Sequence, residues 1–197
     1  CKWLIKIDIL NFFESVSERS VFHVFATLGY QPLVAFELAR ICTRRGEPSW
    51  ARRGARWSYP FGREQVINAY YSLVHLPQGA PTSPMLANLA MTGFDEAISE
   101  IAARHALRYT RYADDLALSA NRDDFSRDDA NAIVGEVYKQ LAVCGFRPNL
   151  SKTSIVPPGA RKVVLGLLVD GPSPRLTKEF RAKLRKHLYY LTHASHG

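Results

Sequence analysis

Cysteine is scarce in this chain, and the few cysteines form no recognisable framework. There are three in 197 residues, an odd number without the spacing of a zinc site: Cys1, Cys42 and Cys144. The six histidines also lack zinc-like spacing. This pattern excludes a disulfide-rich secreted scaffold and a zinc finger, and it favours reduced thiols. We therefore predict a cytoplasmic protein.

Long hydrophobic runs are also missing. The longest apolar stretch covers residues 163–169 and contains Gly166, well short of the roughly 20 residues of a membrane helix. We expect no membrane partner. The chain has no Gly-rich phosphate loop and no Ser/His/Asp or Cys/His arrangement for nucleophilic catalysis. It also lacks an initiator methionine and begins almost inside its first predicted strand, so we interpret it as a fragment.

Acidic residues are outnumbered. Lysine and arginine total 26 against 18 acids, which gives a net charge of +8 and a pI near 9.6. Such an excess favours a polyanionic partner such as nucleic acid, although a merely basic soluble protein is the alternative. Apolar residues make up 47% and charged residues 22%, a composition that excludes a disordered chain and supports a packed core.

One short segment carries two adjacent carboxylates: Tyr112-Ala113-Asp114-Asp115, inside a strand–turn–strand predicted over residues 107–119. Adjacent carboxylates repel each other, and a divalent cation such as Mg²⁺ would neutralise both. A third acid, Asp8, lies near the end of a strand predicted over residues 3–10, on the face away from the apolar stripe. Three carboxylates on neighbouring strands are the minimum for two-metal phosphoryl transfer. A solvent-facing strand acid and a charged hairpin tip are the alternative interpretation.

The remaining pattern predicts an α+β fold with a mostly antiparallel sheet. Ser15 and Ser17 are candidate caps of a helix whose apolar residues continue at helical spacing from Val21 to Leu28. Ser83, followed by proline, predicts the N-cap of one long helix whose buried face extends to Ile101. Ser126 opens a capping box, and Gly145 ends that helix. Further helices are predicted over 33–42 and 177–191, and further strands over 152–156 and 162–169.

Residues 44–63 interleave six arginines with Trp50, Trp57, Tyr59 and Phe61. We predict a loop or short hairpin there. Arginine and aromatic side chains together are suited to hold phosphates and to stack on bases. A solvated basic loop with aromatic rings packed underneath explains the same pattern.

These blocks, in this order, resemble the palm of a reverse transcriptase over nearly the whole chain. The resemblance is carried by the Asp8 strand, the Pro77-Gln78-Gly79 loop, the Asp114-Asp115 hairpin, and segments 149–153 and 164–167. The implied fold class is α+β: a palm with an antiparallel sheet packed on helices, part of the fingers and the start of the thumb. It implies palm over 1–42, a fingers-like basic and aromatic insertion over 43–75, palm with the primer-grip strands over 76–170, and the start of the thumb over 171–197.

Within that superfamily, the sequence of residues 76–84 is most similar to that of bacterial retron-type enzymes. Retrons typically carry an Asn-Ala-x-x-His element, whereas here Asn68-Ala69 is followed by Tyr70, Tyr71 and Ser72. Their Val-Thr-Gly element reads Val164-Leu165-Gly166 in this chain. A related defence-associated bacterial reverse transcriptase is therefore an alternative to a true retron enzyme.

The resemblance implies that Asp8 and Asp114 bind two Mg²⁺ ions, with Mn²⁺ as an alternative ion and Asp115 completing the site. It also implies a metal ligand in the backbone carbonyl of Ile9. Lys152 matches the family's lysine near the leaving pyrophosphate, a candidate proton donor. A loop lysine that is merely solvated is the alternative.

The resemblance also implies nucleotide-binding residues. Phe13 falls at the position of the family's aromatic steric gate, which selects deoxynucleotides by excluding a 2′-hydroxyl; one of Phe12 and Phe13 is expected in the core. Gln78 and Gly79 are expected against the nascent base pair, where glycine allows close backbone approach, although this segment also has the composition of a helix cap. Tyr112 is expected beside the primer terminus.

The implied activity is RNA-directed DNA synthesis from dNTPs on an RNA template with a DNA or RNA primer. A dedicated non-coding RNA, an effector protein and a role in phage defence follow by family analogy. The alternatives are an RNA-dependent RNA polymerase, which shares the palm, and an inactive nucleic-acid-binding scaffold. We expect the fragment alone to bind nucleic acid weakly and to polymerise poorly.

Overall fold

The structure is a computed structural model that describes residues 1–45 and 74–192. Within this part of the chain, a four-stranded sheet has the order β4-β5-β1-β6. Its strands are β1 (Trp3–Asp8), β4 (Arg108–Tyr112), β5 (Asp115–Ala120) and β6 (Ser154–Val156). Every neighbouring pair is antiparallel. The predicted α+β class and antiparallel sheet are thus confirmed.

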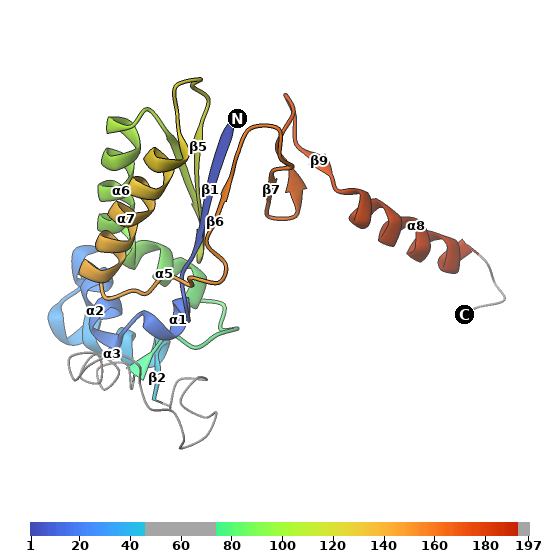
Figure 1. The fold of residues 1–197 in the computed structure, drawn as a ribbon. Coiled ribbons are helices and arrows are strands. Elements are labelled where there is room, and N and C mark those ends of the chain that lie inside the picture. Colours follow the sequence, from blue (N-terminus) through green and yellow to red (C-terminus); the bar gives the residue numbers. More distant parts are fainter. Residues whose placement is uncertain (46–73, 193–197) are drawn as a thin grey trace, which may run out of the picture.

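Alternation along the strands decides which face of the sheet is buried under helices. Ile5 lies opposite Leu118 and Ile7 opposite Leu116, and all four side chains belong to the main core. Helices α6 (Thr92–Arg104) and α7 (Arg127–Val143) cover this face (Figure 1). The predicted division of β1, with Asp8 on the face away from the isoleucines, is confirmed.

The first helices gather at the end of the sheet where β1 finishes (Figure 1). They are α1 (Phe12–Ser15), α2 (Glu18–Thr27), α3 (Pro32–Cys42) and α5 (Ser83–Ala90), beside the short pair β2 (Arg44–Arg45) and β3 (Val74–His75). Ser17 caps α2 as predicted, because its side chain accepts from the Ser20 N–H. Ser15 is not a cap: its hydroxyl donates to the Asn11 carbonyl instead.

The predicted long helix after Ser83 is wrong in two respects. The helix is interrupted at Met91, so that two separate helices, α5 and α6, pack against the core. Ser83 is the first helical residue rather than the N-cap, and its buried hydroxyl donates to the Pro77 carbonyl at 2.7 Å. Leu89, predicted on the buried face, is 37% exposed.

The C-terminal part leaves the sheet. A three-stranded sheet in the order β7-β8-β9 comprises β7 (Val163–Val164), β8 (Leu167–Leu168) and β9 (Arg175–Leu176). The predicted strand over 162–169 is therefore a hairpin, because Leu165 and Gly166 both have positive φ. Helix α8 (Lys178–Thr192) extends away from the four-stranded sheet and has no buried residue (Figure 1). Most of the predicted basic and aromatic loop lies outside the described residues.

The capping box of α7 provides a test of local stability. Ser126 accepts from the Asp129 N–H, and the Asp129 carboxylate accepts from the Ser126 N–H. Ser126→Ala should lower the free energy of unfolding by about 1 kcal/mol, because the helix loses a side-chain acceptor for its first turn. Ser99→Ala, at an exposed position inside α6, is the matched control and should be neutral. Equal urea midpoints for the two variants would contradict this prediction.

Candidate active site

The turn between β4 and β5 carries the paired aspartates. Tyr112 lies opposite Asp115, and Asp115 lies opposite Asp8 on the other neighbouring strand. Ala113 adopts a left-handed conformation, with φ of 52°. The Ile9 N–H donates to the Asp114 carbonyl at 2.9 Å, which ties the turn to the end of β1. The backbone thus brings Asp8, Asp114 and Asp115 to one end of the sheet.

Asp8 is buried although it lies on the face away from the main core, at 6% exposure. Its Oδ1 accepts from Asn149 Nδ2 at 3.0 Å, and its Oδ2 accepts from Lys152 Nζ at 2.9 Å. The Asn149 N–H also donates to the Asp8 carbonyl at 2.7 Å. These contacts contradict the alternative of a solvent-facing strand acid.

Electrostatics at the turn favour a cation. Burial raises the pKa of the Asp114 carboxyl, and the charges of Asp8 and Asp115 raise it further, while a backbone hydrogen bond and Lys152 offset part of the effect. The hydrogen bond to Asp8 and the charge of Asp8 raise the pKa of the Lys152 ammonium. The carboxylates are thus incompletely neutralised by the protein itself.

Asp8, Asp114 and Asp115 lie near one another, but their side chains are not arranged around a common metal position. Among the described residues, no three His, Cys, Asp or Glu side chains already converge on one point. Both oxygens of Asp8 are engaged by Asn149 and Lys152, so its carboxylate faces segment 149–152. Carboxylate and carbonyl oxygens are the donors that Mg²⁺ prefers. The donor set of Asp8, Asp114, Asp115 and the Ile9 carbonyl therefore fits that ion in chemistry.

The two phenylalanines after β1 have separate environments. Phe12 is buried and contacts Phe146 and the guanidinium of Arg111, with centroid distances of 6.0 Å in both cases. Phe13 is half-buried, and its ring lies 5.3 Å from that of Phe12. The expectation that one of the pair belongs to the core is confirmed, and Phe13 is the ring that remains partly accessible.

The Gln-Gly loop and Tyr112 are exposed. Gly79 has φ of 92°, a conformation that favours glycine, and a Cβ added there would meet nothing within 4 Å. The bond from Ser83 to Pro77 ties the loop to the start of α5, so part of the helix-cap interpretation holds. Tyr112 is 68% exposed and its ring is available to a ligand.

Two residues of this site were missed by sequence reasoning. Asn149 holds Asp8 from a position 141 residues away, and Arg111 holds the aspartate turn from the opposite face, donating to the Ala113 carbonyl. The proximity of Asn149 to Lys152 in sequence was a weak signal, because both lie in the segment that carries the resemblance. Arg111 had no signal beyond its place beside Tyr112.

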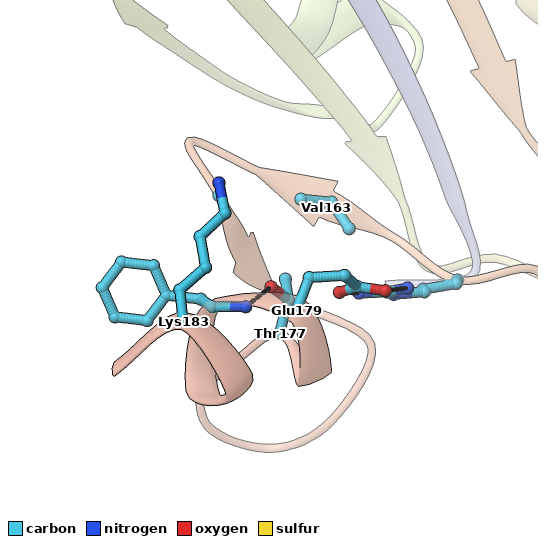
Figure 2. A pocket seen from close by; sticks show the side chains of 7 residues that line it. Val163, Thr177, Glu179 and Lys183 are labelled. Carbon is cyan, nitrogen blue, oxygen red and sulfur yellow. Dashed lines mark hydrogen bonds and ion pairs between the residues drawn. The ribbon is translucent and has the colours of Figure 1, made fainter. Parts of the chain in front are cut away.

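A hollow of about 450 Å³ lies apart from the aspartates, between the β7–β8 hairpin and the first turns of α8. Figure 2 shows Val163 of the hairpin across from Thr177, Glu179 and Lys183. Arg161 donates to both Glu179 oxygens, at 3.0 and 2.7 Å, and this pairing lowers the pKa of Glu179 to about 2. The ion pair joins the segment that leads into β7 to the first turn of α8.

Comparison with known proteins identifies the family. Residues 1–169 match the model of the family described as reverse transcriptase (RNA-dependent DNA polymerase). The chain belongs to the reverse transcriptase family. It is 33% identical over 191 residues to the retron Ec86 reverse transcriptase of Escherichia coli, covering 95% of this chain and 49% of that protein. It is 32% identical over 191 residues to the retron Mx65 reverse transcriptase of Myxococcus xanthus, covering 94% and 40%.

Solved structures support the fold of this reverse transcriptase chain. Apo telomerase from Candida tropicalis, truncated from its C-terminal domain, superposes with a TM-score of 0.54 at 13% identity, over 85% of this chain and 33% of that one. Telomerase from Candida albicans with a telomeric RNA fragment gives 0.53 at 14% identity, over 96% and 35%. The chain spans about half or less of the length of the curated relatives named above. None of its described helices is long and apolar enough to cross a bilayer.

The raised pKa of Asp114 leads to a stability prediction. The folded state holds this proton more tightly than the unfolded chain, so ionisation of Asp114 at neutral pH disfavours folding. Without divalent ions at pH 7, Asp114→Asn should raise Tm, because the variant removes a charge that partial burial and the neighbouring carboxylates disfavour in the folded state.

The gain in Tm should shrink as the pH falls through the raised pKa of Asp114, because the wild-type carboxyl and the asparagine of the variant are then both neutral. Glu100→Gln, an exposed change of the same chemistry on α6, is the control. Thermal unfolding in EDTA, from pH 7 down to the ordinary aspartate pKa of 3.8, provides the measurement. A lower Tm for Asp114→Asn at pH 7 would show that its charge stabilises the fold.

Proposed function

We propose that the protein is an RNA-directed DNA polymerase that adds dNTPs to a primer 3′-hydroxyl by a two-metal mechanism. The observation that carries the proposal is the placement of Asp8 opposite Asp115, with Asp114 in the adjoining turn, in a chain of the reverse transcriptase family. Three carboxylates at one end of a sheet suit a pair of divalent ions bound to phosphate oxygens.

In this mechanism, Asp8, Asp114 and the Ile9 carbonyl would hold Mg²⁺ or Mn²⁺, with Asp115 completing the site. The bound ions would supply activation of the primer hydroxyl and charge neutralisation at the triphosphate. Asn149 keeps the Asp8 carboxylate oriented toward segment 149–152. Lys152, now paired with Asp8, has the reach of a flexible lysine and is the proposed proton donor to the leaving pyrophosphate.

Four further residues belong to the proposed nucleotide site. Gln78 and Gly79 are proposed to contact the nascent base pair, and Tyr112 to contact the primer terminus. Phe13, half-buried beside the buried Phe12, is proposed to lie under the sugar and to exclude a 2′-hydroxyl. The exposed cations of α8 are proposed to track backbone phosphates at the start of the thumb: Lys178, Arg181, Lys183, Arg185 and Lys186.

The biological setting is proposed from the relatives. Those named above are retron reverse transcriptases, so we propose a retron-like enzyme of the cytoplasm that works with a dedicated non-coding RNA. We further propose an effector protein and a role in phage defence. The division into palm (1–42 and 76–170), fingers insertion (43–75) and thumb (171–197) belongs to the same proposal.

Primer extension tests the activity. The full-length protein, an RNA template, a DNA primer, dNTPs and Mg²⁺ should yield extended product. Asp114→Asn/Asp115→Asn should abolish extension, because the donor set loses two charges, whereas the exposed Asp128→Asn on α7 should not. Product from the double variant would refute the assigned site. A folded wild-type protein that binds RNA without extending any primer, including one supplied as its own non-coding RNA, would support the inactive scaffold.

Sugar selection tests Phe13. Phe13→Ala should raise incorporation of ribonucleotides relative to deoxynucleotides by about 10-fold or more, because a steric clash of 1–3 kcal/mol is removed. Single-nucleotide insertion with dNTP and rNTP measures the ratio. Phe22→Ala, at a partly buried ring on α2, controls for loss of packing. Efficient rNTP use by the wild-type protein would instead favour an RNA-dependent RNA polymerase.

A further inference from the structure

Arg111 is a buried cation on the face of the sheet opposite the aspartates. It lies across from Leu116, whose side chain is in the main core, and only 6% of its own side chain is exposed. Burial of a guanidinium is costly unless its donors are satisfied. Arg111 therefore calls for a structural explanation.

Its partners come from two helices and from the turn. Nε and Nη2 donate to the two oxygens of Asp95 at 2.8 and 2.5 Å, a bidentate pair with the first turn of α6. Nη1 donates to Asn88 Oδ1 on α5 and to the Ala113 carbonyl, both at 3.0 Å. Tyr109 adds a further donor to Asp95 at 2.7 Å. The planar guanidinium is thus held in one orientation.

The bond to Ala113 acts on the strained residue of the aspartate turn. A left-handed alanine costs roughly 1–2 kcal/mol, and such a conformation persists only where its surroundings hold it. Ala113 has φ of 52° and directly precedes Asp114. Because Arg111 holds the Ala113 carbonyl, it also holds the peptide plane that leads into Asp114.

The same contacts link the turn to the Gln-Gly loop. Asn88 and Asp95 lie on either side of Met91, where α5 passes into α6. Helix α5 begins at Ser83, whose hydroxyl holds the Pro77 carbonyl. The loop that carries Gln78 and the turn that carries Asp114 are therefore both anchored to the α5–α6 pair.

We propose that Arg111 is a positioning residue that holds Ala113 in its left-handed conformation and thereby orders the carboxylates of Asp114 and Asp115. The catalytic meaning of this ordering rests on the proposed function, but the ordering itself does not. Lysine retains the charge of Arg111 and cannot make the four-donor fork.

Hydrogen exchange of the turn tests the ordering without reference to activity. In the full-length protein without metal, Arg111→Lys should accelerate amide exchange in the peptide spanning 112–115 by about 10-fold, while exchange in α7 stays unchanged. Arg108→Lys, at an exposed position on the same strand, should have no effect. If Arg111→Lys is too unstable for the assay, Asp95→Asn takes its place, because it weakens the same anchor. Wild-type exchange at the turn in the variant would overturn the proposal.

Rescue at Ala113 separates positioning from general packing. Primer extension by Arg111→Lys should fall about 10-fold in kcat, the size of effect seen when supporting residues of a metal site are altered, with little change in the KM for dNTP. Adding Ala113→Gly should recover part of kcat, because glycine adopts this φ without strain. If Ala113→Gly restores no kcat, and the fall in kcat of Arg111→Lys is accompanied by a fall in Tm, then Arg111 serves packing alone.

A wild-type protein that extends no primer would defeat the proposed function, yet the hydrogen-exchange comparison would still decide the role of Arg111. Conversely, active wild-type protein with unaffected Arg111 variants would defeat this inference and leave the proposed function intact.

Discussion

Mutual repulsion among Asp8, Asp114 and Asp115 is the constraint around which this end of the molecule is built. Side chains with like charge separate unless the backbone prevents it, and here the backbone does so through strand register and the bond from Ile9 to the Asp114 carbonyl. Lys152 then neutralises part of the charge on Asp8, and Asn149 donates a hydrogen bond to the same carboxylate. The cluster is thereby held as an oxygen-rich site whose remaining negative charge suits a divalent cation.

The site is held by polar contacts on both faces of the sheet. On one face, segment 149–152 covers Asp8, which lies outside the main core and is nevertheless buried. On the other face, Arg111 connects the aspartate turn to α5 and α6. Ordinary apolar packing between Ile5, Ile7 and the covering helices sets the strand register on which both depend. A polar site on one face of the sheet is thus supported by apolar burial on the other face.

Local signals predicted most of the elements. The alternation of β1, the hairpin of the paired aspartates and the capping box at Ser126 are each visible as a pattern within a few residues of sequence, and the structure confirms them. The errors arose where tertiary contacts prevailed. Serine is a typical N-cap residue, yet the Ser83 hydroxyl donates to the Pro77 carbonyl instead. The apolar run after Ser83 forms two helices rather than one, because the chain bends at Met91 to follow the core.

The sequence by itself determined which residues are candidates for the chemistry and in what order they occur, because paired carboxylates, a Gln-Gly loop and an upstream strand acid can be recognised as residue types at a given spacing. That reading also sufficed to indicate the family, and the match over residues 1–169 confirms it. Only the tertiary structure decided how the site is held. Asn149 reaches Asp8 across 141 residues and Arg111 reaches Asp95 across 16, and pairings through space leave no periodic trace in one chain.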